Sequence, residues 1–176
     1  RKALVEADAK ALSSDTMIKA FERFRSVKKF TDKNAPGRNW NLATSMVIKG
    51  EAAMQFMGDW AKGEFTAAGK EPGVDYLAMP FPETSEYFLF NVDSFIMFKQ
   101  KDKKAREAQD AMARLILQPK FQEVFNINKG SIPVRLGMAR ANFDSPAQRS
   151  MSDFVATAAS GGLVPSMAHE MAVIPE

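Results

Sequence analysis

The residues available for catalysis are few. The chain contains one histidine, His169, and no cysteine, so few pairs of a nucleophile and a general base can form. It also lacks a GxSxG motif, a glycine-rich phosphate loop and a zinc-ligand signature. One option stays open, because Asp59 and Asp93 could act as the acid–base pair of a hydrolase. The side chains therefore favour binding chemistry over catalysis.

Several polar residues stand in contexts that suit a ligand site. Asp93 lies inside an apolar, strand-like segment, where an ionised carboxylate is costly unless donors surround it. Asn91 is two residues earlier, on the same face of that strand. Lys129 precedes a turn limited by Pro133, so its ammonium can enter a cleft with three donors. A metal site on His169 is not expected, because no second histidine or cysteine accompanies it.

The two tryptophans stand just before predicted helices. Gly50 ends one helix, and the apolar run 52–58 after it predicts a buried strand. Asp59 then suits a helix N-cap. Trp60 would therefore lie at the carboxyl end of a strand, where open α/β sheets place their ligand sites. Trp40 follows a turn at residues 34–38.

These residues need elements to position them, and the spacing of apolar residues predicts those elements. Helices are expected over 1–10, 15–27, 41–49, from Trp60 onward, 103–117, 120–126 and 144–159. Strands are expected over 52–58, 76–79 and 87–98. The segment 87–98 is apolar on both sides of the polar residues 91–94 (NVDS), so we expect it to be buried. Ser145 is the expected cap of the final helix, and 165–176 shows no period. Alternating helices and strands predict an α/β fold.

Four segments resemble, in order, one family of proteins. They are GEAAMQFMGDW (50–60), FNVDSFIMF (90–98), QEVFNINKGSIPVRLG (122–137) and GGLVPSMAHEMAV (161–173). Together they resemble the periplasmic (extracellular) sugar-binding proteins of bacterial ABC importers, of the glucose/mannose type. The resemblance extends over essentially the whole chain. Because the chain begins at Arg1 rather than Met, we expect it to be only the C-terminal portion of such a protein.

The resemblance also implies an architecture. Proteins of this type have two lobes joined by crossing strands, a periplasmic-binding-protein fold of type II-like form, which would be incomplete here. On this expectation residues 1–90 belong to the second, C-terminal lobe and 91–94 cross over. Residues 95–145 return to the first lobe, and 146–176 go back to the second.

A hexose offers apolar C–H faces and a rim of hydroxyls, so its site needs aromatic plates and charged or amide groups. The resemblance implies a sugar-binding set that consists of Trp40, Trp60, Asp93, Lys129, His169 and, as a weaker candidate, Asn91. It implies no metal, no cofactor and no catalytic residue. Structural interpretations stay open beside it: core tryptophans, an Asp93 that caps a crossover turn, and a solvated Lys129.

The function implied is that of the substrate-binding component of an ABC sugar importer. It would bind a glucose- or mannose-like hexose in an interlobe cleft, close by a hinge and deliver the sugar to the permease. Its location would be the periplasm, or the outside of a Gram-positive cell with a membrane anchor, and a signal peptide would lie upstream. Expected partners are the permease subunits and the missing N-terminal portion or a second copy. The alternative is a carbohydrate-active enzyme or its accessory carbohydrate-binding module.

Composition and charge argue against two further classes of protein, membrane-embedded proteins and nucleic-acid-binding modules. With 176 residues and 45% hydrophobic content, the chain can bury a sizeable core. No apolar run approaches the ~18 residues of a membrane helix, so we do not expect a membrane-embedded protein. The net charge is +3, but the only basic run, Lys99–Lys104, contains Asp102 and no interleaved aromatic residue. A nucleic-acid-binding module is therefore not expected.

Overall fold

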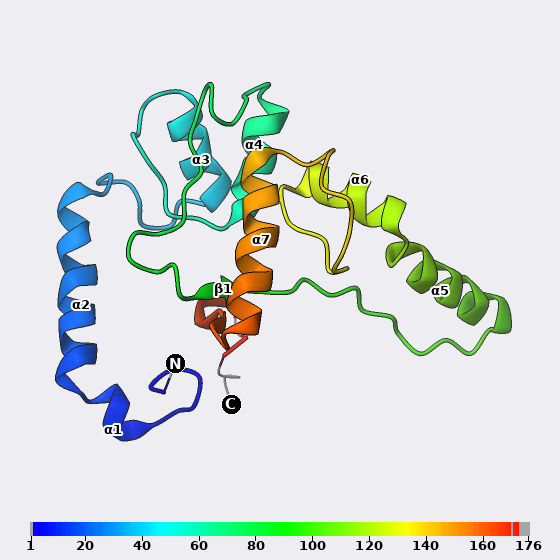
Figure 1. The fold of residues 1–176 in the computed structure, drawn as a ribbon, viewed down its shortest axis with the longest axis horizontal. Coiled ribbons are helices and arrows are strands. Elements are labelled where there is room, and N and C mark those ends of the chain that lie inside the picture. Colours follow the sequence, from blue (N-terminus) through cyan, green and yellow to red (C-terminus); the bar gives the residue numbers. More distant parts are fainter. Residues whose placement is uncertain (1, 170, 173–176) are drawn as a thin grey trace. The chain divides into compact units, whose positions relative to one another are not determined.

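A computed structural model describes residues 2–169, 171 and 172 (Figure 1). The chain forms two compact units. Unit 1 comprises Arg1–Arg38, Phe81–Val92 and Phe154–Glu176, and unit 2 comprises Asn39–Pro80 and Asp93–Asp153. The assignment of segments to two lobes stays a prediction, and expectations for residues 1, 170 and 173–176 lie outside the described residues.

Unit 1 begins with helices α1 (Ala9–Leu12) and α2 (Asp15–Val27), followed by the 3-10 helix η1 (Lys28–Phe30). The prediction for α2 is confirmed, and the Ser14 hydroxyl accepts a hydrogen bond from the main-chain N–H of Met17. The predicted helix over 1–10 is wrong. Ala7 adopts a left-handed φ of 51°, which interrupts a helix, and α1 starts only after Asp8 caps it.

The sheet of unit 1 has two parallel strands, β1 (Phe88–Phe90) and β2 (Leu163–Pro165). Phe88 pairs with Leu163 and Phe90 with Pro165. The predicted strand over 87–98 is thus only three residues long, because β2 offers backbone partners over three residues and no more. β2 itself was not predicted from the sequence. Phe88 packs edge-on against Phe154, with ring centroids 5.5 Å apart, so helix α7 (Ser145–Ala159), which carries Phe154, lies beside β1 (Figure 1).

The other predicted strands do not form among the described residues. Residues 52–58 make no ladder, and Tyr76 contributes only an isolated bridge with Pro72. A strand needs a neighbour for its N–H and C=O groups, and none lies beside these segments. The expected burial of the 87–98 segment is also wrong, since Ile96 is 78% exposed and Phe98 74%. The α/β prediction therefore holds only in a coarser form, as helices with a small parallel sheet.

Unit 2 contains the helices that carry most of the candidate residues. They are α3 (Trp40–Ile48), the 3-10 helix η2 (Asp59–Ala61), α4 (Lys62–Ala67), α5 (Lys103–Ile116), α6 (Pro119–Lys129) and the first part of α7 (Ser145–Ala159). The helices predicted over 41–49, 103–117 and 144–159 are confirmed to within one residue at each end, and α6 is longer than predicted. Every helix in the described part of the chain is too short or too polar to span a bilayer.

Local chemistry sets the helix ends. Pro119 opens α6, and Gly130, with a left-handed φ of 81°, closes it. Two predicted caps are wrong. Gly58, not Asp59, precedes η2, and the carboxylate of Asp144, not Ser145, accepts the N–H of Ala147 at the start of α7. The small core beside this helix start consists of Phe143, Ala147 and Met151, with Ile132 packed against it.

Candidate functional site

Asp93 and Lys129 form an ion pair in unit 2. Their Oδ2 and Nζ atoms lie 3.2 Å apart, and their side chains keep 73% and 45% of their surface exposed. An exposed pair of this kind contributes about 1 kcal/mol or less to stability, so a ligand can separate it at small cost. The pair presents an acceptor and a donor side by side, which suits two neighbouring hydroxyl groups.

Buried amides beneath Lys129 hold the end of α6 and the loop after it. Asn126 donates to the main-chain oxygen of Gln122 at 2.7 Å and accepts from the Ser131 hydroxyl at 2.7 Å. Gln122 accepts from the main-chain N–H of Val134 at 3.0 Å. Gln122 and Asn126 are only 4% and 5% exposed. The main chain at Lys129 is therefore held firmly, while its ammonium reaches solvent.

The turn that carries Trp60 packs directly on this loop. A Cβ on Gly130 would lie 2.9 Å from the main-chain oxygen of Trp60 and 2.7 Å from the nitrogen of Gly63. A Cβ on Gly63 would lie 3.1 Å from the main-chain oxygen of Lys129. Two glycines thus let the backbones touch. The structure brings three predicted site residues, Asp93, Lys129 and Trp60, into one neighbourhood.

The indole of Trp60 lies over Gly58. A Cβ on Gly58 would overlap the six-membered ring of the indole, so only glycine allows this placement. Between them, Asp59 is half-buried. Desolvation raises the pKa of its carboxyl, Lys62 opposes that rise, and the negative charge of Asp144 adds to it.

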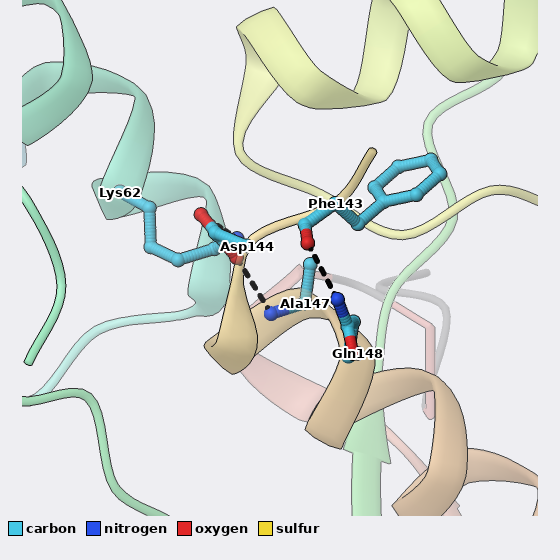
Figure 2. Close-up of polar contacts among 5 residues, drawn as sticks. All are labelled: Lys62, Phe143, Asp144, Ala147 and Gln148. Atoms are coloured by element: carbon cyan, nitrogen blue, oxygen red, sulfur yellow. Dashed lines mark hydrogen bonds and ion pairs between the residues drawn. The ribbon is translucent and has the colours of Figure 1, made fainter. Parts of the chain in front are cut away.

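Lys62 and Asp144 form a second ion pair that the sequence reasoning missed. Nζ of Lys62 lies 2.8 and 3.0 Å from the two carboxylate oxygens of Asp144. Lys62 is buried, with 4% exposure. Figure 2 shows Asp144 also accepting the N–H of Ala147, and the Gln148 side chain donating to the main-chain oxygen of Phe143. The pair joins the start of α4 to the start of α7. The sequence signal was an Asp directly before Ser145-Pro146.

A cavity of about 240 Å³ borders this pair. Its polar lining includes Lys62, Asn126 and Asp144, whose side chains already bond within the protein. Nearby, Tyr76 stacks on Phe65 with ring centroids 4.0 Å apart. The Tyr76 hydroxyl is buried and has no hydrogen-bond partner in the described part of the chain. Desolvation, and then the charge of Asp144, raise the pKa of Tyr76 to about 12.

Asn91 and His169 form a separate group in unit 1. Asn91 directly follows β1, and Ser166 directly follows β2, so both stand at the carboxyl edge of the sheet. Buried Ser166 donates its N–H to the main-chain oxygen of Phe90 at 2.8 Å. Its hydroxyl lies 2.7 Å from Nδ1 of His169, which orients the exposed imidazole.

Trp40 lies in unit 2 on a different element from Trp60. It is the first residue of α3, and it is 40% exposed. Its main-chain oxygen accepts from Gln55 and from Thr44, each at 3.0 Å. The buried Thr44 hydroxyl also bonds the Gln55 side chain. These bonds attach the 50–58 segment to the start of α3 without a strand.

Comparison with known proteins gives the family. A profile of the bacterial extracellular solute-binding protein family matches residues 3–151. A "Probable sugar-binding periplasmic protein" of Brucella suis is 46% identical over 169 residues, which is 96% of this chain and 40% of that protein. An "Uncharacterized ABC transporter extracellular-binding protein" of Pyrococcus horikoshii is 35% identical, over 90% of this chain and 34% of that protein.

A "Xylose/arabinose-binding protein" of Haloferax volcanii is 26% identical over 91% of this chain and 34% of its own length. The chain thus spans 34–40% of the length of these three curated relatives. The profile match extends over most of the chain and includes Trp40, Trp60, Asp93 and Lys129. The chain therefore belongs to the bacterial extracellular solute-binding protein family.

Proposed function

We propose that this chain is part of the substrate-binding component of an ABC sugar importer and that it binds a monosaccharide resembling glucose or mannose. The observation that carries the proposal is the exposed Asp93–Lys129 pair, 3.2 Å apart, in which Lys129 ends α6 next to the Trp60 turn. Membership of a solute-binding family and a relative named as sugar-binding support it.

Sugar binding would exchange one weak ion pair for stronger hydrogen bonds. The carboxylate of Asp93 accepts from a hydroxyl, and the ammonium of Lys129 donates to an adjacent one. Hydrogen bonds to charged groups contribute roughly 1.5–3 kcal/mol each, more than an exposed ion pair does. Trp60 and Trp40 supply aromatic faces for the C–H surfaces of the ring. Asn91 and His169 add an amide and an imidazole.

Delivery of the sugar follows from a change of conformation. In a two-lobed receptor, the sugar stabilises the closed state in proportion to its greater affinity for that state. The permease then recognises the closed form on the outer side of the membrane. This part of the proposal concerns the whole protein, including its upstream signal peptide and periplasmic location, or extracellular location with an anchor.

Hydrolysis is the alternative, and the charge arrangement favours binding over it. Asp93 pairs with Lys129, whereas Asp59 is coupled to Lys62 and Asp144. Each of the two carboxylates thus belongs to its own charge cluster. A glycosidase requires two carboxyl groups that face one bond. We therefore propose a non-catalytic role, in which the sugar leaves the protein unchanged.

The test is isothermal titration of glucose, mannose, galactose, xylose and arabinose into the full-length protein. We expect a hexose to bind most tightly. Asp93→Asn and Lys129→Met should each weaken it about 10- to 150-fold, since 1.4 kcal/mol corresponds to a factor of ten. Lys103→Met is the matched control, because Lys103 forms a comparable exposed pair with Glu107 at 3.7 Å.

Two results would contradict the proposal. One is the absence of heat with every sugar, and the other is unchanged affinity in both Asp93→Asn and Lys129→Met. Incubation with disaccharides, followed by chromatography, decides between binding and hydrolysis. Recovery of intact sugar is expected, and released monosaccharide would favour the enzyme.

A further inference from the structure

We infer that Gly63 and Gly130 are positioning residues for the sugar site: their backbone contact sets the distance between the Trp60 turn and Lys129. The inference rests on the proposed function. Neither glycine has a side chain that could contact a ligand. The inference follows instead from how closely main-chain atoms approach their Cα atoms.

Gly130 is constrained in two ways. Its φ of 81° lies in the left-handed region that side chains disfavour. A Cβ there would also lie 2.7 Å from the nitrogen of Gly63, 2.9 Å from the oxygen of Trp60 and 3.3 Å from the oxygen of Asp59. All three are main-chain atoms, which cannot rotate away as a side chain can.

Gly63 is constrained by contact alone. It lies within α4, where alanine is the better helix former. A Cβ on Gly63 would lie 3.1 Å from the main-chain oxygens of both Asn128 and Lys129. These oxygens belong to the last turn of α6. Helix propensity therefore favours alanine at this position, and the approach of α6 opposes it.

Both sides of the contact are anchored by buried groups. On one side, Lys62, the neighbour of Gly63, is buried and bonds both oxygens of Asp144. On the other side, buried Asn126 bonds the Ser131 hydroxyl next to Gly130. A methyl group inserted between the two backbones forces them apart, by a few tenths of an ångström at Gly63 and by more at Gly130. It must change the relation between the Trp60 turn and Lys129, and a misplaced donor weakens a preorganised site.

The experiment measures sugar affinity in full-length variants that circular dichroism shows to be folded. The probe is D-glucose, or whichever of mannose, galactose and xylose the wild type binds most tightly. We expect Gly63→Ala and Gly130→Ala each to weaken binding about tenfold or more, that is, by about 1.4 kcal/mol. Gly137→Ala is the control for Gly130→Ala, because Gly137 has a φ of 73° but no heavy atom within 4 Å of the point where a Cβ would lie. It should bind like the wild type.

A double-mutant cycle separates positioning from a merely structural role. In a Lys129→Met background, Gly63→Ala should change the affinity less than twofold, because the group that it misplaces is gone. An unchanged affinity in both glycine variants overturns the inference, whatever happens to their melting temperatures. An undiminished effect in the Lys129→Met background overturns it too. If Gly63→Ala does not fold, the Gly130→Ala and Gly137→Ala pair decides. A wild type that binds no sugar contradicts the proposed function itself.

Discussion

Lys62 is the residue on which the α4–α7 contact depends most directly. Its ammonium is buried and bonds both carboxylate oxygens of Asp144. Asp144 in turn caps α7 through the N–H of Ala147. Removal of Lys62 leaves the Asp144 carboxylate, whose side chain is 30% exposed, without its cation. The expected cost is therefore at the lower end of that for a fully buried pair, and still larger than the loss of an exposed pair.

Lys62→Met should therefore lower the free energy of unfolding by about 3 kcal/mol. Urea unfolding followed by circular dichroism measures the change. The control is Lys70→Met, since Lys70 forms a more exposed pair with Asp75 at 3.1 Å, and the expected change there is below about 1 kcal/mol. Equal changes in the two variants would show that burial of Lys62 is not what matters.

Tyr76 makes stability depend on alkaline pH. Its folded-state pKa of about 12 lies above the ordinary value of 10.0, so the folded state keeps the neutral phenol while the unfolded state ionises. This contribution to stability is complete below pH 10 and is lost as the pH rises toward 12. Between those values the wild type should lose about 1–2 kcal/mol more of its free energy of unfolding than Tyr76→Phe, because solvent screens part of the effect of burial.

Urea titrations of the wild type and Tyr76→Phe at pH 8, 10 and 11.5 test this dependence. Tyr87→Phe is the matched control, because it removes the hydroxyl of an exposed tyrosine. At pH 8 we expect Tyr76→Phe to equal or exceed the wild type in stability, since its hydroxyl has no partner in the described residues. Parallel pH profiles for the wild type and Tyr76→Phe would contradict the assigned burial.

At the residue scale, the sequence indicates which residues stand in unusual local surroundings better than it indicates which residues touch one another. Asp93 and Lys129 were selected for their local surroundings, and the structure finds them 3.2 Å apart; their role with a sugar stays a prediction. Lys62 and Asp144 were missed because 82 positions separate them. A lone lysine after Trp60 and an aspartate before Ser145 carry no sign that they will meet.

At the element scale, hydrogen bonds of buried amides fix the position of α6, whereas apolar packing fixes the position of most helices. Asn126 bonds Gln122 and Ser131, and Gln122 bonds the loop at Val134. A buried network of this kind stabilises only while every member is satisfied. Its loss would free the loop that follows Lys129.

Asn126→Ala should lower the free energy of unfolding by about 2 kcal/mol, because it removes the hydrogen bonds of a buried amide and leaves the half-buried Ser131 hydroxyl without its acceptor. Asn128→Ala is the control on the same helix: its amide is exposed and bonds only the main-chain oxygen of Val124 at 2.8 Å. We expect that change to stay below about 0.5 kcal/mol. Thermal unfolding measures both, and a larger effect of Asn128→Ala would contradict the importance of the network.

Helices were predicted well and strands poorly, for a physical reason. Each helix end depends on residues within one turn, such as Ser14 before α2 or Gly130 after α6. A strand depends on a distant partner. The run 52–58 looks like a strand but has no partner among the described residues. β2 has a partner in β1, yet three residues of Leu-Val-Pro leave no alternating pattern to detect.

At the scale of the whole molecule, many large apolar side chains are exposed in the described part of the chain. Large ones that are at least 70% exposed include Phe24, Phe30, Val74, Leu77, Met79, Ile96, Phe98 and Leu136. Buried apolar residues are few by comparison, with Phe65, Phe143, Ala147 and Met151 as the described set. Exposed apolar side chains in such number favour contact with another chain or segment.

We therefore predict that the 176-residue chain, taken alone, self-associates at micromolar concentration. Size-exclusion chromatography with light scattering measures the mass. Ile96→Ser with Phe98→Ser should reduce association, and Lys101→Ser, which removes an exposed charge nearby, should not. A clean monomer at every concentration would contradict the prediction.

The family was accessible from the sequence because four segments between residues 50 and 173 resemble it in order. The assignment of segments to two lobes stays a prediction, because it depends on how the segments pack in the whole protein. Within the structure, one division falls between Val92 and Asp93 and another between Asp153 and Phe154. The second lies inside α7, where the continuous period of a helix gives no hint of a boundary.

With a carboxylate and an ammonium held 3.2 Å apart, the surface at Asp93 and Lys129 is close to electrically neutral. For an anionic solute such as a uronic acid, attraction to Lys129 would be offset by repulsion from Asp93. For a cationic amino sugar, attraction to Asp93 would be offset by repulsion from Lys129. Either ion would still have to shed its hydration shell without a compensating charge. Uncharged sugars carry no such burden, so under the proposed function the ion pair would act as a filter against charged solutes.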